Sequence, residues 1–253
     1  MSERVEQTIS SFDGTELAVH RMGAGRPVVL LHGLFSSAEM NWVRFGHAGK
    51  LVEAGFEAIM PDLRAHGTSG KPHAPESYPP GVLARDAAAL VAALDLDDYD
   101  LVGFSLGART SARAVIEGLQ PRRLVLAGMG LEGLAGWNRR AAYFIDAIDR
   151  FDEVKRGDPA FMPVSFMKTM KIDRVAARLL LQAVDDTAPA ELSAISMPTM
   201  VLCGDKDDDN GSAERLAETL PDARHVEIPG THMGSVTEGA LGDALVRFLG
   251  NND

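Results

Sequence analysis

Six short apolar runs, separated by segments with helical periodicity, constrain the fold of this 253-residue chain more than any other feature. Runs of this kind are typical of parallel strands buried on both faces. They cover residues 27–33, 56–61, 100–103, 123–127, 199–203 and 225–228. Helical periodicity spans residues 81–94, 106–118, 213–220 and 237–249. Strand alternating with helix predicts an α/β fold, with a mostly parallel central sheet and helices on both faces.

Two segments depart from this alternation. Residues 5–11 and 16–20 read as a hairpin, because Asp13-Gly14 between them supplies a tight turn. Residues 131–196 contain no strand-like run, and residues 141–150 and 175–184 have the pattern of amphipathic helices. We expect an inserted helical lid over residues 131–196, within a single domain of residues 1–253.

Composition narrows the classes of partner. The net charge of −11, with no cluster of Lys and Arg, disfavours nucleic acid and anionic membrane surfaces. Cys203 is the only cysteine, so no intrachain disulfide can form and a reducing compartment is expected. Residues 1–6 lack the pattern of a signal peptide, and no apolar run is long enough to span a bilayer. We therefore expect a cytoplasmic protein that acts on a small molecule, with its oligomeric state left open.

A candidate nucleophile follows the strand-like run at residues 100–103. The sequence Gly103-Phe104-Ser105-Leu106-Gly107 joins that run to a helix, which is the strand–turn–helix setting of a nucleophile elbow. Glycines suit such a turn, because helix and strand pass closely there. The first N–H groups of the helix can also face developing negative charge. Ser105 is therefore the predicted nucleophile.

A candidate base and acid follow the last two strand-like runs. His232 lies in a loop after residues 225–228, where it can reach Ser105. A histidine base needs an acid to fix its tautomer, and an aspartate-rich loop follows residues 199–203. The chain order serine, acid, histidine is the order expected for this kind of triad. On residue types alone the acid stays open among Asp205, Asp207 and Asp208, and the loop lacks the spacing of a calcium motif.

Acyl transfer also needs two donors for a developing oxyanion. The sequence His32-Gly33-Leu34-Phe35 begins at the end of the run at residues 27–33, so we expect the N–H groups of Leu34 and Leu106 to act together. The His32 side chain is interpreted as a packed group that orders this loop.

Together these motifs resemble the α/β-hydrolase superfamily across nearly the whole chain, in the branch of small esterases, cofactor-free haloperoxidase-like enzymes and carbon–carbon bond hydrolases. The resemblance also rests on the loop at residues 62–69, which implies a structural loop near the oxyanion site and has Ala65 in place of the usual glycine. It implies the α/β-hydrolase fold, with Asp207, the last aspartate of Gly-Asp-x-Asp, as the acid. Glu132 is the position of the acid in some relatives. The chain continues with Asp208-Asp209-Asn210-Gly211 where relatives often have proline or apolar residues.

The lid and the loops supply a candidate substrate pocket. Its predicted lining is aromatic and apolar and comprises Phe35, Phe104, Trp137, Phe144, Phe166 and Met233. We expect hydrolysis of a small to medium, mostly apolar carboxylic ester, lactone or thioester, with no cofactor and no metal. The alternatives are a non-catalytic small-molecule receptor, or a cofactor-free carbon–carbon hydrolase, perhydrolase or lyase using the same triad. Ser105 disfavours dehalogenases and epoxide hydrolases, whose nucleophile is an aspartate.

Overall fold

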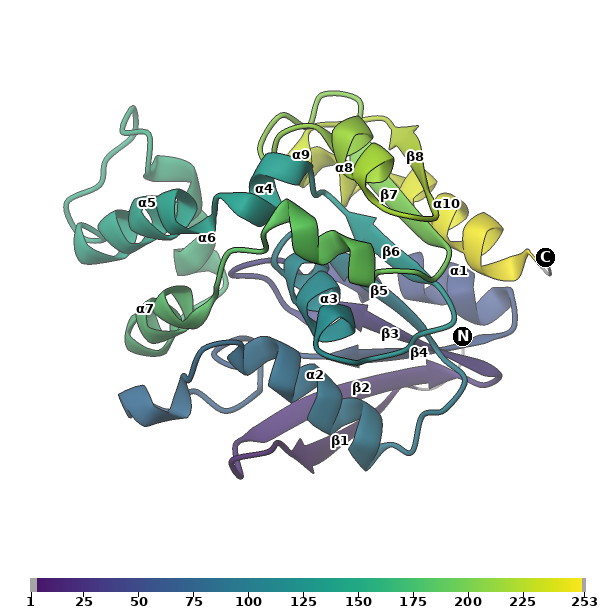
Figure 1. Ribbon diagram of the computed structural model, residues 1–253. Coiled ribbons are helices and arrows are strands. Elements are labelled where there is room, and N and C mark those ends of the chain that lie inside the picture. The colour runs from purple at the N-terminus through teal and green to yellow at the C-terminus, as the bar shows by residue number, and fades with distance from the viewer. Residues whose placement is uncertain (1–3, 252–253) are drawn as a thin grey trace.

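A mixed eight-stranded sheet forms the centre of the molecule (Figure 1). The computed structural model describes residues 4–251, so the first three residues of the N-terminal segment lie outside it. The predicted hairpin and the six predicted runs all form strands. In spatial order these are β1 (Val5–Ser10), β2 (Glu16–Gly23), β4 (Phe56–Pro61), β3 (Arg26–Leu31), β5 (Asp100–Phe104), β6 (Leu124–Ala127), β7 (Thr199–Gly204) and β8 (Ala223–Ile228).

The six strands β3 to β8 are parallel to one another, and β2 runs antiparallel to both of its neighbours, β1 and β4. Its two faces are buried by separate sets of helices. Helices α1 (His47–Glu53) and α10 (Gly239–Gly250) pack together on one face. The other face carries α2 (Val82–Ala93), α3 (Leu106–Ile116) and α8 (Ala213–Thr219).

Alternate side chains of each central strand serve these two cores. Leu101 of β5 packs with the cluster under α2 and α3, whereas Val102 packs with the cluster under α1 and α10. Because both faces of the strands are buried, their sequences are apolar throughout, which is the signal that identifies them in the sequence.

A helical insertion, which we call the lid after that prediction, lies between β6 and β7. Residues 131–196, all of which the structure describes, form helices and no strand. Helices α5, α6 and α7 form a lobe beside the sheet in Figure 1. Of these, α5 and α7 overlap the predicted helices, while α4 and α6 are additional. The bounds are α4 (Leu131–Ala135), α5 (Trp137–Asp149), α6 (Phe161–Thr169), α7 (Arg174–Ala183) and the 3-10 helix η3 (Pro189–Ala194).

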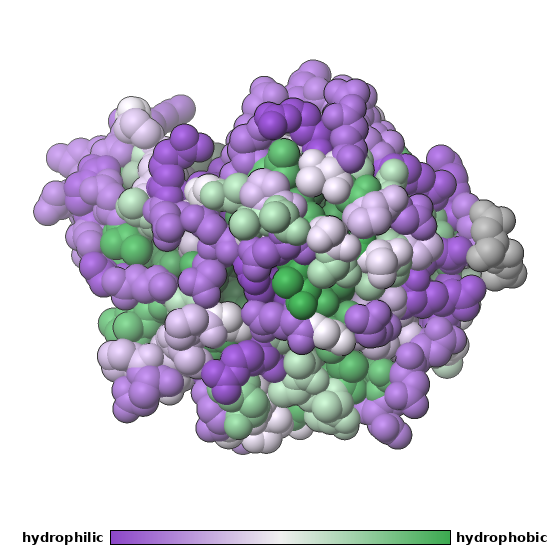
Figure 2. Space-filling view, viewed as in Figure 1, coloured by the Kyte–Doolittle hydropathy of each residue, from purple (hydrophilic) through white to green (hydrophobic). Residues whose placement is uncertain are grey.

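Short helical turns complete the chain: the π-helix η1 (Glu39–Val43), the 3-10 helix η2 (Pro75–Ser77) and α9 (His232–Ser235). Figure 2 shows one face of the molecule, where polar residues cover much of the surface and hydrophobic residues are exposed in separate patches. Within residues 4–251, no helix has the length and apolar character needed to cross a membrane.

Candidate active site

Ser105 stands at a sharp turn between β5 and α3. Its backbone has φ 54° and ψ −109°, a conformation that L-residues rarely adopt, and its N–H donates to Ala127 O at 2.8 Å. Two glycines make the turn possible. A Cβ on Gly103 would lie 2.2 Å from Gly107 O, and one on Gly107 would lie 2.1 Å from Leu31 O. The close crossing of helix and strand therefore presents Ser105 at the end of the sheet.

His232 lies within hydrogen-bonding distance of Ser105. Its Nε2 is 3.0 Å from Ser105 Oγ. The histidine is the first residue of α9, whose N-cap Thr231 accepts a hydrogen bond from Gly234 N–H. The ring of Phe104 packs against the imidazole, with 5.1 Å between the two centroids. These contacts hold the imidazole in one position beside the serine.

Asp207 is the acid that the structure places beside His232. Its Oδ2 lies 2.9 Å from His232 Nδ1, and only 1% of its side chain is exposed. Its other oxygen accepts a hydrogen bond from Asp209 N–H at 3.2 Å. Because the carboxylate accepts a hydrogen bond from Nδ1–H, the proton stays on Nδ1 and the lone pair of Nε2 faces the Ser105 hydroxyl.

The alternative acids lie elsewhere. Asp205 accepts a hydrogen bond from Gly230 N–H at 2.8 Å and so shapes the loop before the histidine. Asp208 is exposed. Glu132 is exposed and pairs with Arg215 while accepting a hydrogen bond from Ser212 N–H. The structure thus brings one of the four candidate acids to His232.

The loop at residues 32–36 presents the N–H of Leu34. Gly33 N–H donates to Asn41 Oδ1 at 3.1 Å, and Phe35 N–H donates to His66 Nε2 at 3.0 Å. Between them, Leu34 N–H has no hydrogen-bond partner in the part of the chain that the structure describes. Leu106 is the first residue of α3, directly after Ser105, so its N–H belongs to the unpaired first turn of that helix.

Two buried histidines hold this loop in place. His32 donates from Nδ1 to Gly33 O at 2.8 Å and accepts from Leu63 N–H at 3.0 Å. His66 donates from Nδ1 to Arg64 O and accepts from Phe35 N–H. Burial lowers the pKa of His32 and lowers the pKa of His66 to about 3. Both rings are therefore neutral at neutral pH, which their role as acceptors requires. His32 orders the loop, as expected from the sequence.

The loop at residues 62–69 braces the loop at residues 32–36 and the hairpin. The Asp62 carboxylate accepts hydrogen bonds from Ala38 N–H and Thr68 N–H, each at 2.8 Å. The buried Arg64 guanidinium pairs with Asp86 on α2 and with Asp13 in the turn between β1 and β2. Ala65 has φ 68°, in the left-handed region, which explains why relatives favour glycine there.

A cavity of about 310 Å³ opens over Ser105. Of the six predicted pocket residues, Phe104, Phe166 and Met233 line it, and so does Leu34. The remaining lining residues are Gly33, Ser36, Met40, Asn41, Phe45, Ser105, His232, Val236 and Thr237.

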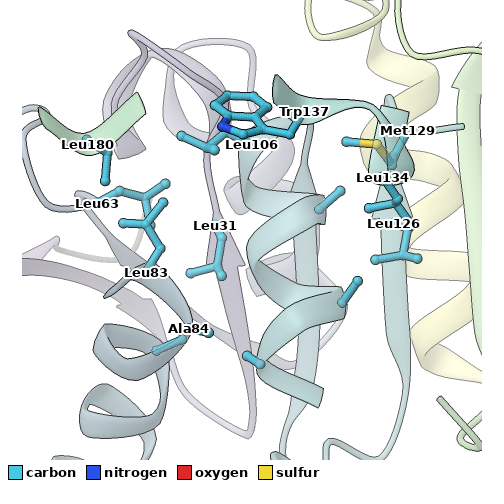
Figure 3. Packing of buried hydrophobic residues seen from close by; sticks show 14 of the residues in the cluster. Leu31, Leu63, Leu83, Ala84, Leu106, Leu126, Met129, Leu134, Trp137 and Leu180 are labelled. Atoms are coloured by element: carbon cyan, nitrogen blue, oxygen red, sulfur yellow. The ribbon is translucent and has the colours of Figure 1, made fainter. Parts of the chain in front are cut away.

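Phe35, Trp137 and Phe144 lie outside this lining. Phe35 takes a positive φ of 58° and packs edge to face against Phe144, with 5.6 Å between centroids. Trp137 is buried and donates from Nε1 to Leu181 O at 3.1 Å. Figure 3 shows it among the buried residues of the cluster that includes Leu106 and Leu134. These three aromatic residues pack the lid onto the core.

The lining residues around η1 and at Val236 were not predicted from the sequence. Met40, Asn41 and Phe45 come from a segment without a periodic signal, so neither their element nor their direction could be inferred. Val236 could have been predicted as a lining residue, because it lies four residues after His232, about one helical turn along the chain. Among residues 4–251 no group of His, Cys, Asp and Glu side chains is arranged to hold a metal ion.

Comparison with known proteins adds three findings. A family model described as "Alpha/beta hydrolase family" matches residues 28–240. A non-heme haloperoxidase of Rhodococcus erythropolis is 27% identical, over 92% of this chain and 94% of its own length. An epoxide hydrolase of Siraitia grosvenorii is 34% identical, but over only 42% of this chain and 33% of its own length.

Among solved structures, an esterase from Exiguobacterium antarcticum superposes with a TM-score of 0.81 at 22% identity. The match covers 98% of this chain and 100% of the esterase chain. At this identity the likeness shows a shared fold.

Proposed function

Because the chain belongs to the alpha/beta hydrolase family and has its fold, we propose that it hydrolyses a small to medium, mostly apolar carboxylic ester through an acyl-enzyme on Ser105. One observation carries the proposal. A continuous chain of hydrogen bonds runs from Asp207 through His232 to Ser105, and the serine borders an apolar cavity. An activated alcohol beside an apolar cavity suits attack on an acyl carbon.

The mechanism follows from the positions of these groups. His232 Nε2 takes the Ser105 proton as Oγ attacks the acyl carbon, and the N–H groups of Leu34 and Leu106 stabilise the oxyanion. The tetrahedral intermediate collapses and expels the alcohol, which takes the proton from His232. His232 then accepts a proton from water as the water attacks the acyl carbon. The second tetrahedral intermediate collapses, His232 returns its proton to Ser105 Oγ, and the carboxylic acid departs.

Asp207 has an electrostatic part in both steps. A carboxylate with 1% exposure beside His232 Nδ1 favours the protonated imidazole that each step forms. Because the carboxylate also fixes the tautomer, Nε2 is ready to accept the serine proton.

The cavity supports the proposed substrate class. Phe104, Phe166, Phe45 and Met233 give it an apolar wall, and its volume of about 310 Å³ suits a short acyl chain. Lactones and thioesters present the same acyl carbon, so they belong to the same proposal.

The similarity to a haloperoxidase favours one second candidate, perhydrolysis. In that reaction hydrogen peroxide replaces water at the second step, attacks the acyl-enzyme and leaves as a peracid. The residues and their roles are the same, and only the acyl acceptor differs.

The test is steady-state hydrolysis of nitrophenyl esters from acetate to decanoate, with the acid and alcohol products identified, by the wild type and by Ser105→Ala. The proposal expects repeated turnover, a specificity constant that is highest for short to medium acyl chains, and no turnover by Ser105→Ala. A peracid formed faster than the acid when peroxide is added would favour the second candidate. A folded wild type that binds esters, lactones and thioesters without repeated turnover would contradict both and favour a receptor.

A further inference from the structure

Asn41 is the one residue of the cavity wall with a buried side-chain nitrogen that makes no hydrogen bond to residues 4–251. The residue belongs to η1, is 2% exposed and borders the cavity that contains Ser105. Its Oδ1 accepts the hydrogen bond from Gly33 N–H at 3.1 Å. Its Nδ2 makes no hydrogen bond within residues 4–251.

The bond to Gly33 determines which way the Asn41 amide faces. If oxygen and nitrogen exchanged places, two donors would meet at Gly33, so the oxygen must lie on that side. Nδ2 then lies on the side of the amide that faces away from Gly33 N–H. A buried donor left unpaired is unfavourable, so a partner supplied by a bound molecule would be a gain.

The amide lies close to the nucleophile. A Cβ built on Gly33 would stand 3.6 Å from Ser105 Cβ and 3.7 Å from Asn41 Oδ1, so a single glycine separates the two side chains. Both side chains border the same cavity, so an acyl group attached to Ser105 Oγ would share that cavity with Asn41.

The other polar groups of the wall have different tasks. Ser105 and His232 bind each other, and the Thr237 hydroxyl donates to Gly234 O at 2.8 Å. Ser36 contributes a hydroxyl, which can rotate to donate or accept. Among the side chains of the wall, only Asn41 offers an unpaired donor of fixed direction.

We infer that Asn41 is a specificity-determining residue, whose Nδ2 donates a hydrogen bond to an oxygen atom in the acyl chain of the substrate. The preferred esters then carry an ether, keto or hydroxyl oxygen one or two carbons beyond the scissile carbonyl, within an otherwise apolar chain. This inference rests on the proposed esterase function and narrows its substrate class.

The test compares two nitrophenyl esters of nearly equal shape, the methoxyacetate and the butanoate. The measured quantity is the ratio of their specificity constants in the wild type and in Asn41→Leu, which is similar in shape and lacks the amide. Asn41→Leu also removes the acceptor for Gly33 N–H, but that loss affects both esters equally and cancels in the ratio. The intrinsic difference in reactivity between the two esters cancels in the same way.

We expect the ratio to fall about 3- to 10-fold in Asn41→Leu, the effect of one hydrogen bond. Asn41→Asp, which keeps an oxygen for Gly33 and loses the donor, should lower the ratio as well and serves if Asn41→Leu does not fold. The matched control is Thr237→Val, which removes a hydroxyl that already has a partner and should leave the ratio as in the wild type.

If the wild type is active and both Asn41→Leu and Asn41→Asp keep its ratio, this inference is overturned and the esterase function stands; Nδ2 would then serve a bound water. A folded wild type that hydrolyses neither ester would overturn the proposed function, and the inference with it.

Discussion

At the scale of single residues, the proposed chemistry depends on one carboxylate among several. Asp207 is buried against His232, whereas Asp208, the next residue, is exposed. Asp207→Asn should lower kcat about 10⁴-fold with little change in stability, because an amide in that place favours the wrong imidazole tautomer. Asp208→Asn is the matched control and should retain activity. Equal losses in the two variants, measured with one nitrophenyl ester, would contradict the assignment of the acid.

The burial of His66 should make the stability of the protein depend on pH. Burial lowers the pKa of His66 to about 3, whereas a histidine in the unfolded chain has a pKa near 6.5. Between these values the unfolded chain binds a proton that the folded chain does not, so the free energy of unfolding falls as the pH is lowered through this window. One such proton contributes a slope of about 1.4 kcal/mol per pH unit.

The variant His66→Gln tests this pH dependence. It places an amide oxygen near Phe35 N–H and cannot be protonated, so its stability should depend less steeply on pH than that of the wild type between about pH 6 and 5. The measurement is urea unfolding at several pH values in that range. Parallel stability curves for the two proteins would show that His66 is not buried in its neutral form.

At the scale of elements, the crossing of α3 over the sheet leaves no room for a side chain. Gly107→Ala would place a methyl group 2.1 Å from Leu31 O, so we expect a loss of more than about 3 kcal/mol or no folded protein. Gly49→Ala, in α1, meets no atom within 4 Å and should be neutral or stabilising by up to about 1 kcal/mol. Thermal unfolding of both variants measures this difference. A folded Gly107→Ala of wild-type stability would contradict the close crossing of α3 over β3.

The side chain of Arg109 attaches the lid to α3. Arg109 is buried and donates to Leu134 O at 2.9 Å, to Asp185 O at 3.1 Å and to Gly133 O. Its guanidinium also stacks on the Trp137 ring, 4.8 Å from the centroid. One side chain of α3 therefore binds two separate parts of the lid.

Arg109→Met should destabilise the protein by about 2–3 kcal/mol, since three carbonyl groups lose a charged donor. Hydrogen exchange should become faster across residues 131–196 and stay unchanged in β3 and β5. The control is Arg178→Met, whose ion pair with Asp149 lies on the surface and contributes about 0–1 kcal/mol. Unchanged exchange in the lid of Arg109→Met would show that the lid is held by apolar packing alone.

The elements differ in how far the sequence predicts them. Strands β3 to β7 are largely buried on both faces and give nearly unbroken apolar runs, so the sequence identifies them. The edge strand β8 has exposed Arg224 and Glu227 and gave only the short run at residues 225–228, and Asp13-Gly14 marked the hairpin. Helix α6 and the turn η1 were not predicted. Residues 161–169 include Pro163 and are apolar at six of their first seven positions, so no helical periodicity marks α6, and η1 has only five residues. Trp137 and Phe144 show the same limit, because an aromatic residue in a lid helix can face the cavity or the core with the same periodicity.

At the scale of the whole molecule, the site joins segments that lie far apart in the sequence. Ser105, Asp207 and His232 follow three different strands, and a parallel sheet brings the carboxyl ends of those strands to one edge. Chain order and topology therefore predicted their proximity. The Gly33–Asn41 and Phe35–His66 bonds depend on side chains in irregular loops, so only the structure reveals how the Leu34 N–H is presented.

The identity of the nucleophile is tested most directly by intact-protein mass spectrometry after treatment with a fluorophosphonate, which reacts with activated serines. We expect a single adduct that maps to Ser105 in the wild type, persists in Ser36→Ala, and is lost in Ser105→Ala and strongly slowed in His232→Ala. Ser36 is the matched control because its hydroxyl borders the same cavity. A folded wild type that forms no adduct, or forms one on another residue, would contradict the claim that Ser105 is the nucleophile.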